Sequence, residues 1–154
     1  MKSEPTARVL AGAAAGLVAG TTNLIAAGII FGGTLTHGLQ TIAAGLLGDA
    51  AFKGGTPTAV LGACLHYGIS MVAVAIYFEA ARQLTWLRDH WLIGGTLFGV
   101  IAYVVMNLIV VPLSNAASPD LSPATIAKEL VAHTVMFGIP LAGIITALLR
   151  KPVN

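Results

Sequence analysis

Apolar residues gather in four long stretches of the chain, and most of the polar residues fall between these stretches. Each stretch reaches the roughly 20 residues that an α-helix needs to cross the hydrocarbon core of a bilayer. The four predicted spans cover about residues 9–31, 57–78, 91–111 and 123–149. The pattern therefore predicts an all-α membrane protein, a four-transmembrane-helix bundle that forms a single integral membrane domain over residues 1–154.

The first stretch follows a short arm with basic residues, an arrangement that a cleaved signal peptide also has. The uncharged run from Val9 to Phe31 is longer than the apolar core of such a peptide. We therefore expect this run to be the first span.

The segment between the first two spans, about residues 33–52, mixes polar and apolar residues. Four of its apolar residues recur every three or four positions: Leu35, Leu39, Ile42 and Leu46. This spacing predicts a short amphipathic helix between spans 1 and 2, which either lies in the membrane interface or re-enters the bilayer. In the interface, it would cover the mouth of whatever the bundle encloses.

The composition supports a membrane protein and excludes several other classes. Hydrophobic residues make up 56% of the chain and charged residues 9%, with a mean hydropathy of +0.87. A formal net charge of +2 and 6% aromatic residues leave no basic or base-stacking surface, so we expect no nucleic-acid partner. The single cysteine, Cys64, cannot form an internal disulfide.

Lysine and arginine are distributed unevenly along the spans. Of the eight, only Lys53 and Lys128 fall on one side of the membrane. The other six fall on the opposite side: Lys2, Arg8, Arg82, Arg88, Arg150 and Lys151. Because cytoplasmic loops carry the excess of Lys and Arg, both termini are predicted to be cytoplasmic, as an even number of spans also allows.

Glycines recur every fourth residue in two of the spans. The first contains Gly12, Gly16 and Gly20, and the third contains Gly95 and Gly99. This G-x-x-x-G spacing makes a flat helix face on which another helix can pack closely. The face of the first span either packs within the monomer or forms the seam of a homo-oligomer.

Isolated polar residues within the spans are expected to face other helices. In the first span, the Asn23 amide needs an interhelical partner. Ser122 is predicted to cap the fourth helix, which Pro123 opens, and Pro140 should distort that helix between Met136 and Pro140.

Four polar side chains are the candidates for an intramembrane site: His66, Asn107, Glu129 and His133. Glu129 and His133 are four residues apart, so they share one helix face and can touch. At about 1.5 Å per residue, the four lie in two adjacent layers in the outer half of the bundle. We therefore predict that they form one inward-facing cluster, because ionisable groups in hydrocarbon are costly unless paired or facing protein.

Several phrases of the sequence resemble one family of proteins. They are LQTIAAGLLGDAAFKGG at residues 39–55, LHYGISMVAVAIYFEAARQL at 65–84, YVVMNLIVVPLS at 103–114 and AHTVMFGIPLA at 132–142. The chain resembles a family of small, uncharacterised four-span bacterial inner-membrane proteins and, more distantly, the YagU-like inner-membrane proteins. Asn23 stands where members of that family often carry an acidic residue. The resemblance implies a four-span fold in the bacterial cytoplasmic (inner) membrane and no particular activity.

Three functions fit the four polar residues. They are structural contacts between helices, a site for protons or a small polar solute, or a metal or haem site that uses His66 and His133. The sequence contains no recognised spacing motif of metal ligands, no nucleophile motif and no phosphate-binding loop. We therefore expect a non-enzymatic protein without a cofactor, whose partner is the lipid bilayer.

Overall fold

The computed structural model describes residues 4–150, with residues 4–11 and Phe31 described by their backbone alone. It confirms the all-α four-helix bundle, and no strand occurs within residues 4–150. The first two spans are α1 (Glu4–Phe31) and α3 (Gly55–Gln83). The third is α5 (Trp91–Val105), continued by a π-helix, η2 (Met106–Val110). The fourth consists of α6 (Pro123–His133), a second π-helix, η3 (Thr134–Gly138), and α7 (Ile139–Arg150). The connections contain α2 (Leu35–Leu47), a 3-10 helix, η1 (Gly48–Lys53), and α4 (Thr85–Asp89).

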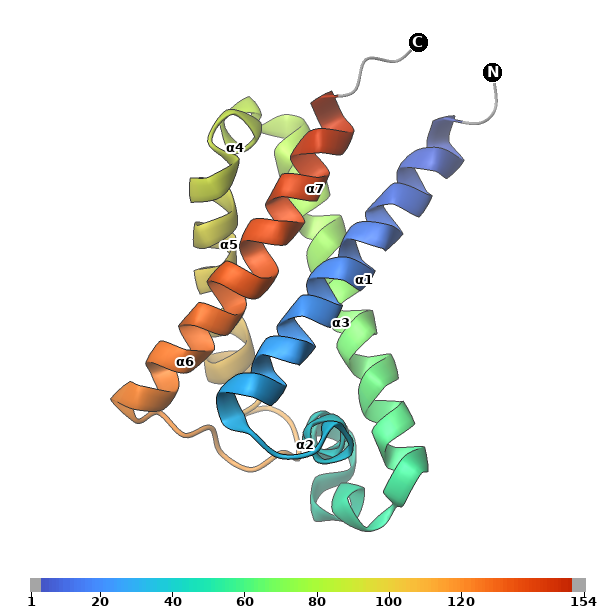
Figure 1. Cartoon of the computed structure of the whole chain (residues 1–154), viewed down its shortest axis with the longest axis vertical. Coiled ribbons are helices and arrows are strands. Elements are labelled where there is room, and N and C mark those ends of the chain that lie inside the picture. Colours follow the sequence, from blue (N-terminus) through green and yellow to red (C-terminus); the bar gives the residue numbers. More distant parts are fainter. Residues whose placement is uncertain (1–3, 151–154) are drawn as a thin grey trace.

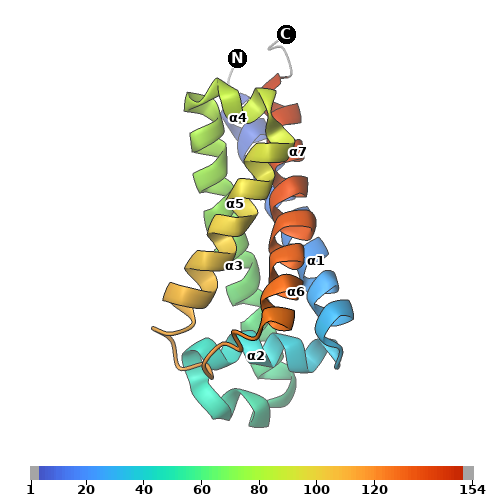
Figure 2. The same cartoon turned by 90° about the vertical axis from the view of Figure 1, so that its left-hand side faces the viewer.

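The spans run alternately up and down, so the connections gather at two ends (Figure 1). The start of α1, helix α4 and the end of α7 lie at one end, and α2 and η1 lie at the other (Figures 1 and 2). The fourth span packs against each of the other three. Arg82, Arg88 and Arg150 thus share the α4 end, whereas Lys53 and Lys128 lie towards the α2 end. Lys2 and Lys151 lie outside the described residues, and the cytoplasmic location of the α4 end stays a prediction.

Helix α3 is longer than the apolar run that predicts it. It begins at Gly55 and continues to Gln83, beyond the expected end at Phe78. Its last turns carry Glu79 and Arg82, whose side chains pair at 2.9 Å. Such a pair at i,i+3 supports a helix, so the charges that end the apolar run do not end the helix.

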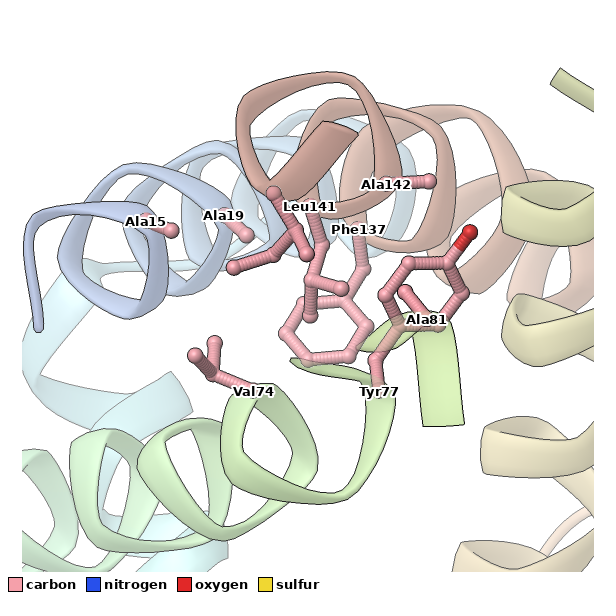
Figure 3. Close-up of a cluster of buried hydrophobic side chains, with 9 residues drawn as sticks. Ala15, Ala19, Val74, Tyr77, Ala81, Phe137, Leu141 and Ala142 are labelled. Carbon is pink, nitrogen blue, oxygen red and sulfur yellow. The ribbon is translucent and has the colours of Figure 1, made fainter. Parts of the chain in front are cut away.

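The largest core joins three spans in the half of the bundle nearer α4 (Figure 3). Small residues of α1, Ala15 and Ala19, allow α3 and the fourth span to approach closely. Tyr77 of α3 and Leu141 and Ile145 of α7 are its largest fully buried side chains. Phe98 of α5 packs against this core from outside, edge-on to Tyr77 with ring centroids 5.1 Å apart.

The outer faces of the spans are apolar and exposed. Between 22% and 39% of each span's most apolar window is buried inside the protein. Large apolar side chains, including Ile29, Val72, Ile76 and Ile101, are more than half exposed. Exposed apolar area of this extent marks a surface covered by another phase or partner. Four helices of this length and apolarity make the chain a multi-pass membrane protein.

Helix α2 lies across one end of the bundle (Figure 2). Its inner face is made of small and polar residues, since Gln40, Ala43 and Ala44 are buried whereas Leu35 and Leu46 are exposed. Gln40 Nε2 donates to the Gly55 carbonyl at 3.1 Å and to the Thr58 hydroxyl at 3.3 Å. Leu35 and Leu46 of the predicted amphipathic pattern therefore point away from the bundle, whereas Leu39 and Ile42 are partly buried.

The fourth span begins and distorts where the sequence predicts. The Ser122 hydroxyl accepts from the Thr125 N–H, and Pro123 occupies the first turn. The distortion is a π-helical turn from Thr134 to Gly138, which overlaps the predicted segment from Met136 to Pro140 but ends two residues before the proline. Proline has no N–H to donate and its ring crowds the carbonyl four residues earlier, which here is that of Met136.

Candidate functional site

Glycines let α5 touch the fourth span backbone to backbone at its π-helical turn. A Cβ atom at Gly99 would lie 2.6 Å from the Cα atom of Thr134, and one at Gly95 would lie 2.7 Å from the Gly138 carbonyl oxygen. Gly138 is equally close to α5, since its Cβ would meet the Gly99 nitrogen at 2.9 Å. Because no side chain separates the helices, α5 fixes the position of His133, the residue before this turn.

Glu129 and His133 are in contact on the fourth span, as their spacing predicts. His133 Nδ1 lies 3.4 Å from the Glu129 carboxylate and 2.8 Å from the Glu129 carbonyl oxygen. A carbonyl only accepts, so Nδ1 carries a proton and, in the neutral ring, Nε2 is left as an acceptor. Tyr103 of α5 contacts the imidazole edge-on, with centroids 5.9 Å apart. We call Glu129, His133 and Tyr103 the carboxylate–imidazole site.

The length of the fourth span gives an expected depth for this site in the membrane. The fourth span has 28 residues, about 42 Å of helix, against a hydrocarbon core of about 30 Å. With the span centred, Glu129 lies about 3 Å and His133 about 9 Å inside the core, on the α2 side. Their side chains are 26% and 17% exposed. An acidic group at the boundary thus leads to an imidazole deeper in the membrane.

His66 of α3 has a different partner from the one predicted. Its Nε2 lies 2.8 Å from the Gly20 carbonyl oxygen of α1, which makes Nε2 the protonated nitrogen. The neighbouring Tyr67 hydroxyl is 2.9 Å from the Thr21 hydroxyl. His66 therefore belongs to a polar contact between α1 and α3.

Asn107 lies in the π-helical part of the third span. Its amide donates to the Tyr103 carbonyl of its own helix at 3.3 Å. The hydrogen bond of Asn107 to the carboxylate–imidazole site is thus to the backbone of Tyr103, one helical turn earlier. Among residues 4–150, no hydrogen bond or ion pair joins His66 or Asn107 to Glu129 or His133.

Two side chains of α1 bind backbone carbonyls of the fourth span. The Thr22 hydroxyl lies 2.6 Å from the Met136 carbonyl oxygen, nearer than two carbonyls of its own helix at 3.0 Å, and Pro140 has no N–H to offer the Met136 carbonyl. Asn23 Nδ2 donates to the Ala132 carbonyl at 3.1 Å, which is the interhelical partner expected for this amide. Each such contact contributes about 0.6 kcal/mol on average, and together they hold α1 against the distorted turn.

Tyr67 and Tyr103 are members of these contacts that the sequence analysis missed. Tyr103 stands four residues before Asn107 and Tyr67 directly after His66. The i,i+4 spacing could have identified Tyr103 as a residue on the same helix face. Nothing comparable in the sequence identifies Tyr67.

The glycines of the first span face α3 of the same chain. A Cβ atom at Gly16 would lie 2.7 Å from the Met71 sulfur, and one at Gly20 would lie 2.9 Å from the Ser70 hydroxyl. At Gly12 the nearest such atom is 4.0 Å away. These contacts place the glycine face within the monomer, and a homo-oligomer stays a prediction.

The described part of the structure adds no further ligands to His66 and His133 for a metal or haem site. Within the described part of the chain, no three or more His, Cys, Asp or Glu side chains are grouped so that they could hold a metal ion. His66 and His133 each use one ring nitrogen on a backbone carbonyl, His66 on α1 and His133 on its own helix.

The chain matches no protein-family model, no curated protein and no solved structure. The resemblance to small four-span inner-membrane proteins therefore stays a prediction, and the carboxylate–imidazole site has to be interpreted from its own chemistry.

Proposed function

We propose that this multi-pass membrane protein takes up and releases protons at the carboxylate–imidazole site, without catalysing a covalent reaction. The observation that carries the proposal is the 3.4 Å contact between the Glu129 carboxylate and His133 Nδ1 inside a membrane span. Ionisable groups in spans are rare and commonly mark proton relays and solute pathways. A carboxylate and an imidazole are both proton-binding groups, and Nε2 of His133, the acceptor of the neutral ring, is the position that a further proton would occupy.

The surroundings of the site favour proton exchange over a purely structural role. His66, Thr22 and Asn23 each bind a carbonyl of another helix, which is what helix-joining side chains do. Glu129 and His133 instead bind each other on one helix and remain partly exposed. The contact between the two groups lies within one helix, and the ring of Tyr103 is what joins the site to another span.

Proton flux through proteoliposomes tests the proposal. Protein reconstituted with a pH-sensitive dye inside the vesicles should dissipate an imposed pH gradient faster than empty vesicles, with valinomycin and potassium present to balance charge. Glu129→Gln and His133→Gln should each remove most of the added rate. Glu79→Gln is the matched control, since it removes a carboxylate that is paired with Arg82 at the α4 end.

Two results would contradict the proposal. One is a rate equal to that of empty vesicles. The other is a flux that Glu129→Gln and Glu79→Gln change equally, which would show that the carboxylate of the site plays no special part. In either case, Glu129 and His133 would be structural residues.

A further inference from the structure

Three arginines whose side chains the structure describes gather at the α4 end of the bundle, and their partners differ. Arg82 is paired with Glu79 at 2.9 Å. Arg88 binds backbone carbonyls among the described residues: its Nη1 donates to those of Ala81 at 3.1 Å and of Arg82 at 3.4 Å. Arg88 thus holds the last turn of α3 without using a carboxylate, and it keeps its full charge.

Arg150, at the end of α7, reaches the same short helix. Its Nη2 donates to the Arg88 carbonyl at 2.5 Å and lies 3.7 Å from the Asp89 carboxylate. Both groups of that ion pair are more than half exposed, and pairs of this length and exposure neutralise little charge. Backbone carbonyls therefore hold both cations in place: Arg88 lies in the connection between α3 and α5, and Arg150 reaches it from the end of α7.

Aromatic side chains indicate the depth of this connection. Trp86 of α4 is 46% exposed and stacks on His90 with ring centroids 5.2 Å apart. Trp91 begins the next span directly afterwards. Tryptophans concentrate at the headgroup level of a bilayer, where the anionic group on offer is a lipid phosphate.

We propose that Arg88 and Arg150, beside Trp86, bind the phosphate of an anionic phospholipid headgroup. Arg88 supplies the guanidinium N–H groups that its two carbonyl bonds leave over, and Arg150 supplies those directed away from Asp89. A guanidinium fork suits a phosphate because two parallel N–H groups match two phosphate oxygens. Fixing both side chains on carbonyls beforehand lowers the entropy lost when the lipid binds.

Brominated lipids test this proposal, because they quench the fluorescence of nearby tryptophan. The chain has two tryptophans, so Trp91→Phe leaves Trp86 as the only reporter. In mixed vesicles, brominated phosphatidylglycerol should quench Trp86 with a higher relative affinity than brominated phosphatidylcholine. Arg88→Gln and Arg150→Gln should each lower this preference about fivefold, or to unity where the native preference is smaller.

Arg82→Gln is the matched control, since it removes the same charge from the same end and should lower the preference less than either of the other two variants does. An equal loss in Arg82→Gln would show diffuse charge attraction and overturn the site. A native preference near unity would also overturn it. So would displacement by inorganic phosphate at constant ionic strength, which would indicate a soluble anion instead of a lipid. Should Arg88→Gln fail to fold by circular dichroism, the comparison of Arg150→Gln with Arg82→Gln decides.

Discussion

Replacing Gly99 with Ala tests whether backbone contact between α5 and the fourth span positions the candidate site. The new Cβ atom would lie 2.6 Å from the Cα atom of Thr134 and 2.8 Å from the His133 carbonyl carbon. Ordinary carbon contacts are about 3.5–4.0 Å, so the helices must separate by about 1 Å. Backbone atoms cannot rotate out of the way as a flexible side chain can.

The size of the effect follows from two opposing terms. Overpacking of a tight contact costs about 1–3 kcal/mol. Replacing a helical glycine with alanine gains about 0.4–1 kcal/mol where there is space. Gly68 of α3 supplies the control, because nothing lies within 4 Å of a Cβ atom there. Gly68→Ala should therefore stabilise the protein, and Gly99→Ala should be less stable than Gly68→Ala by roughly 1–3 kcal/mol.

Unfolding of both variants in mixed micelles by titration with sodium dodecyl sulfate, followed by circular dichroism, measures this difference. In proteoliposomes, His133→Gln should have a smaller effect on proton flux in the Gly99→Ala background than in the native one, because the two sites are in contact. Equal stabilities of Gly99→Ala and Gly68→Ala would refute the reasoning, since they would mean that α5 does not press on the backbone at His133.

Three further predictions follow from particular contacts. Thr22→Val should cost about 0.6–2 kcal/mol in the same unfolding assay, and less in a Pro140→Ala background, where residue 140 regains an N–H for the Met136 carbonyl; equal costs in both backgrounds would contradict the pairing. A cysteine at Ser118 in a Cys64→Ser background should react with an impermeant thiol reagent added outside cells, whereas one at Asn154, outside the described residues, should not; the reverse pattern would invert the predicted orientation. Hydrogen bonds from the Thr125 and Ser122 hydroxyls and the Ser122 N–H hold the pKa of Asp120 below its usual value. The ionised carboxylate therefore stabilises the fold at a pH above the usual pKa, and this stabilisation is lost as the pH falls through the lowered pKa. An acid sensitivity that Asp120→Asn leaves unchanged would contradict this.

The sequence predicts the spans well because charged residues are costly in lipid, so each span appears as a long run with few charges. The apolar runs locate all four spans within a few residues, except that α1 already begins at Glu4 and α3 continues to Gln83. Ser122 and Pro123 locate the start of the fourth span, since capping is a local property. The contact between Glu129 and His133 is also local, so its spacing alone predicts it.

Contacts between helices are harder to predict from the sequence. His66 and Asn23 both bind backbone carbonyls. Because every residue has a carbonyl, the sequence does not identify which one accepts the bond. Pro140 indicates that a carbonyl becomes free, but not that Thr22 of another helix binds it. Equal depth in the membrane also does not decide which faces meet: Glu129 and His133 contact each other, whereas His66 binds α1 and Asn107 binds its own helix.

The central claim is that Glu129 and His133 act as one proton-exchanging pair. Infrared difference spectroscopy of the protein in bilayers tests it, because a carboxyl group absorbs differently when protonated. We predict a carboxyl signal that responds to the pH of the medium, disappears in Glu129→Gln and changes in His133→Gln, but remains as it is in the exposed-histidine control His37→Gln. A spectrum in which Glu129 gives no pH response, or the same response with and without His133, would contradict the account.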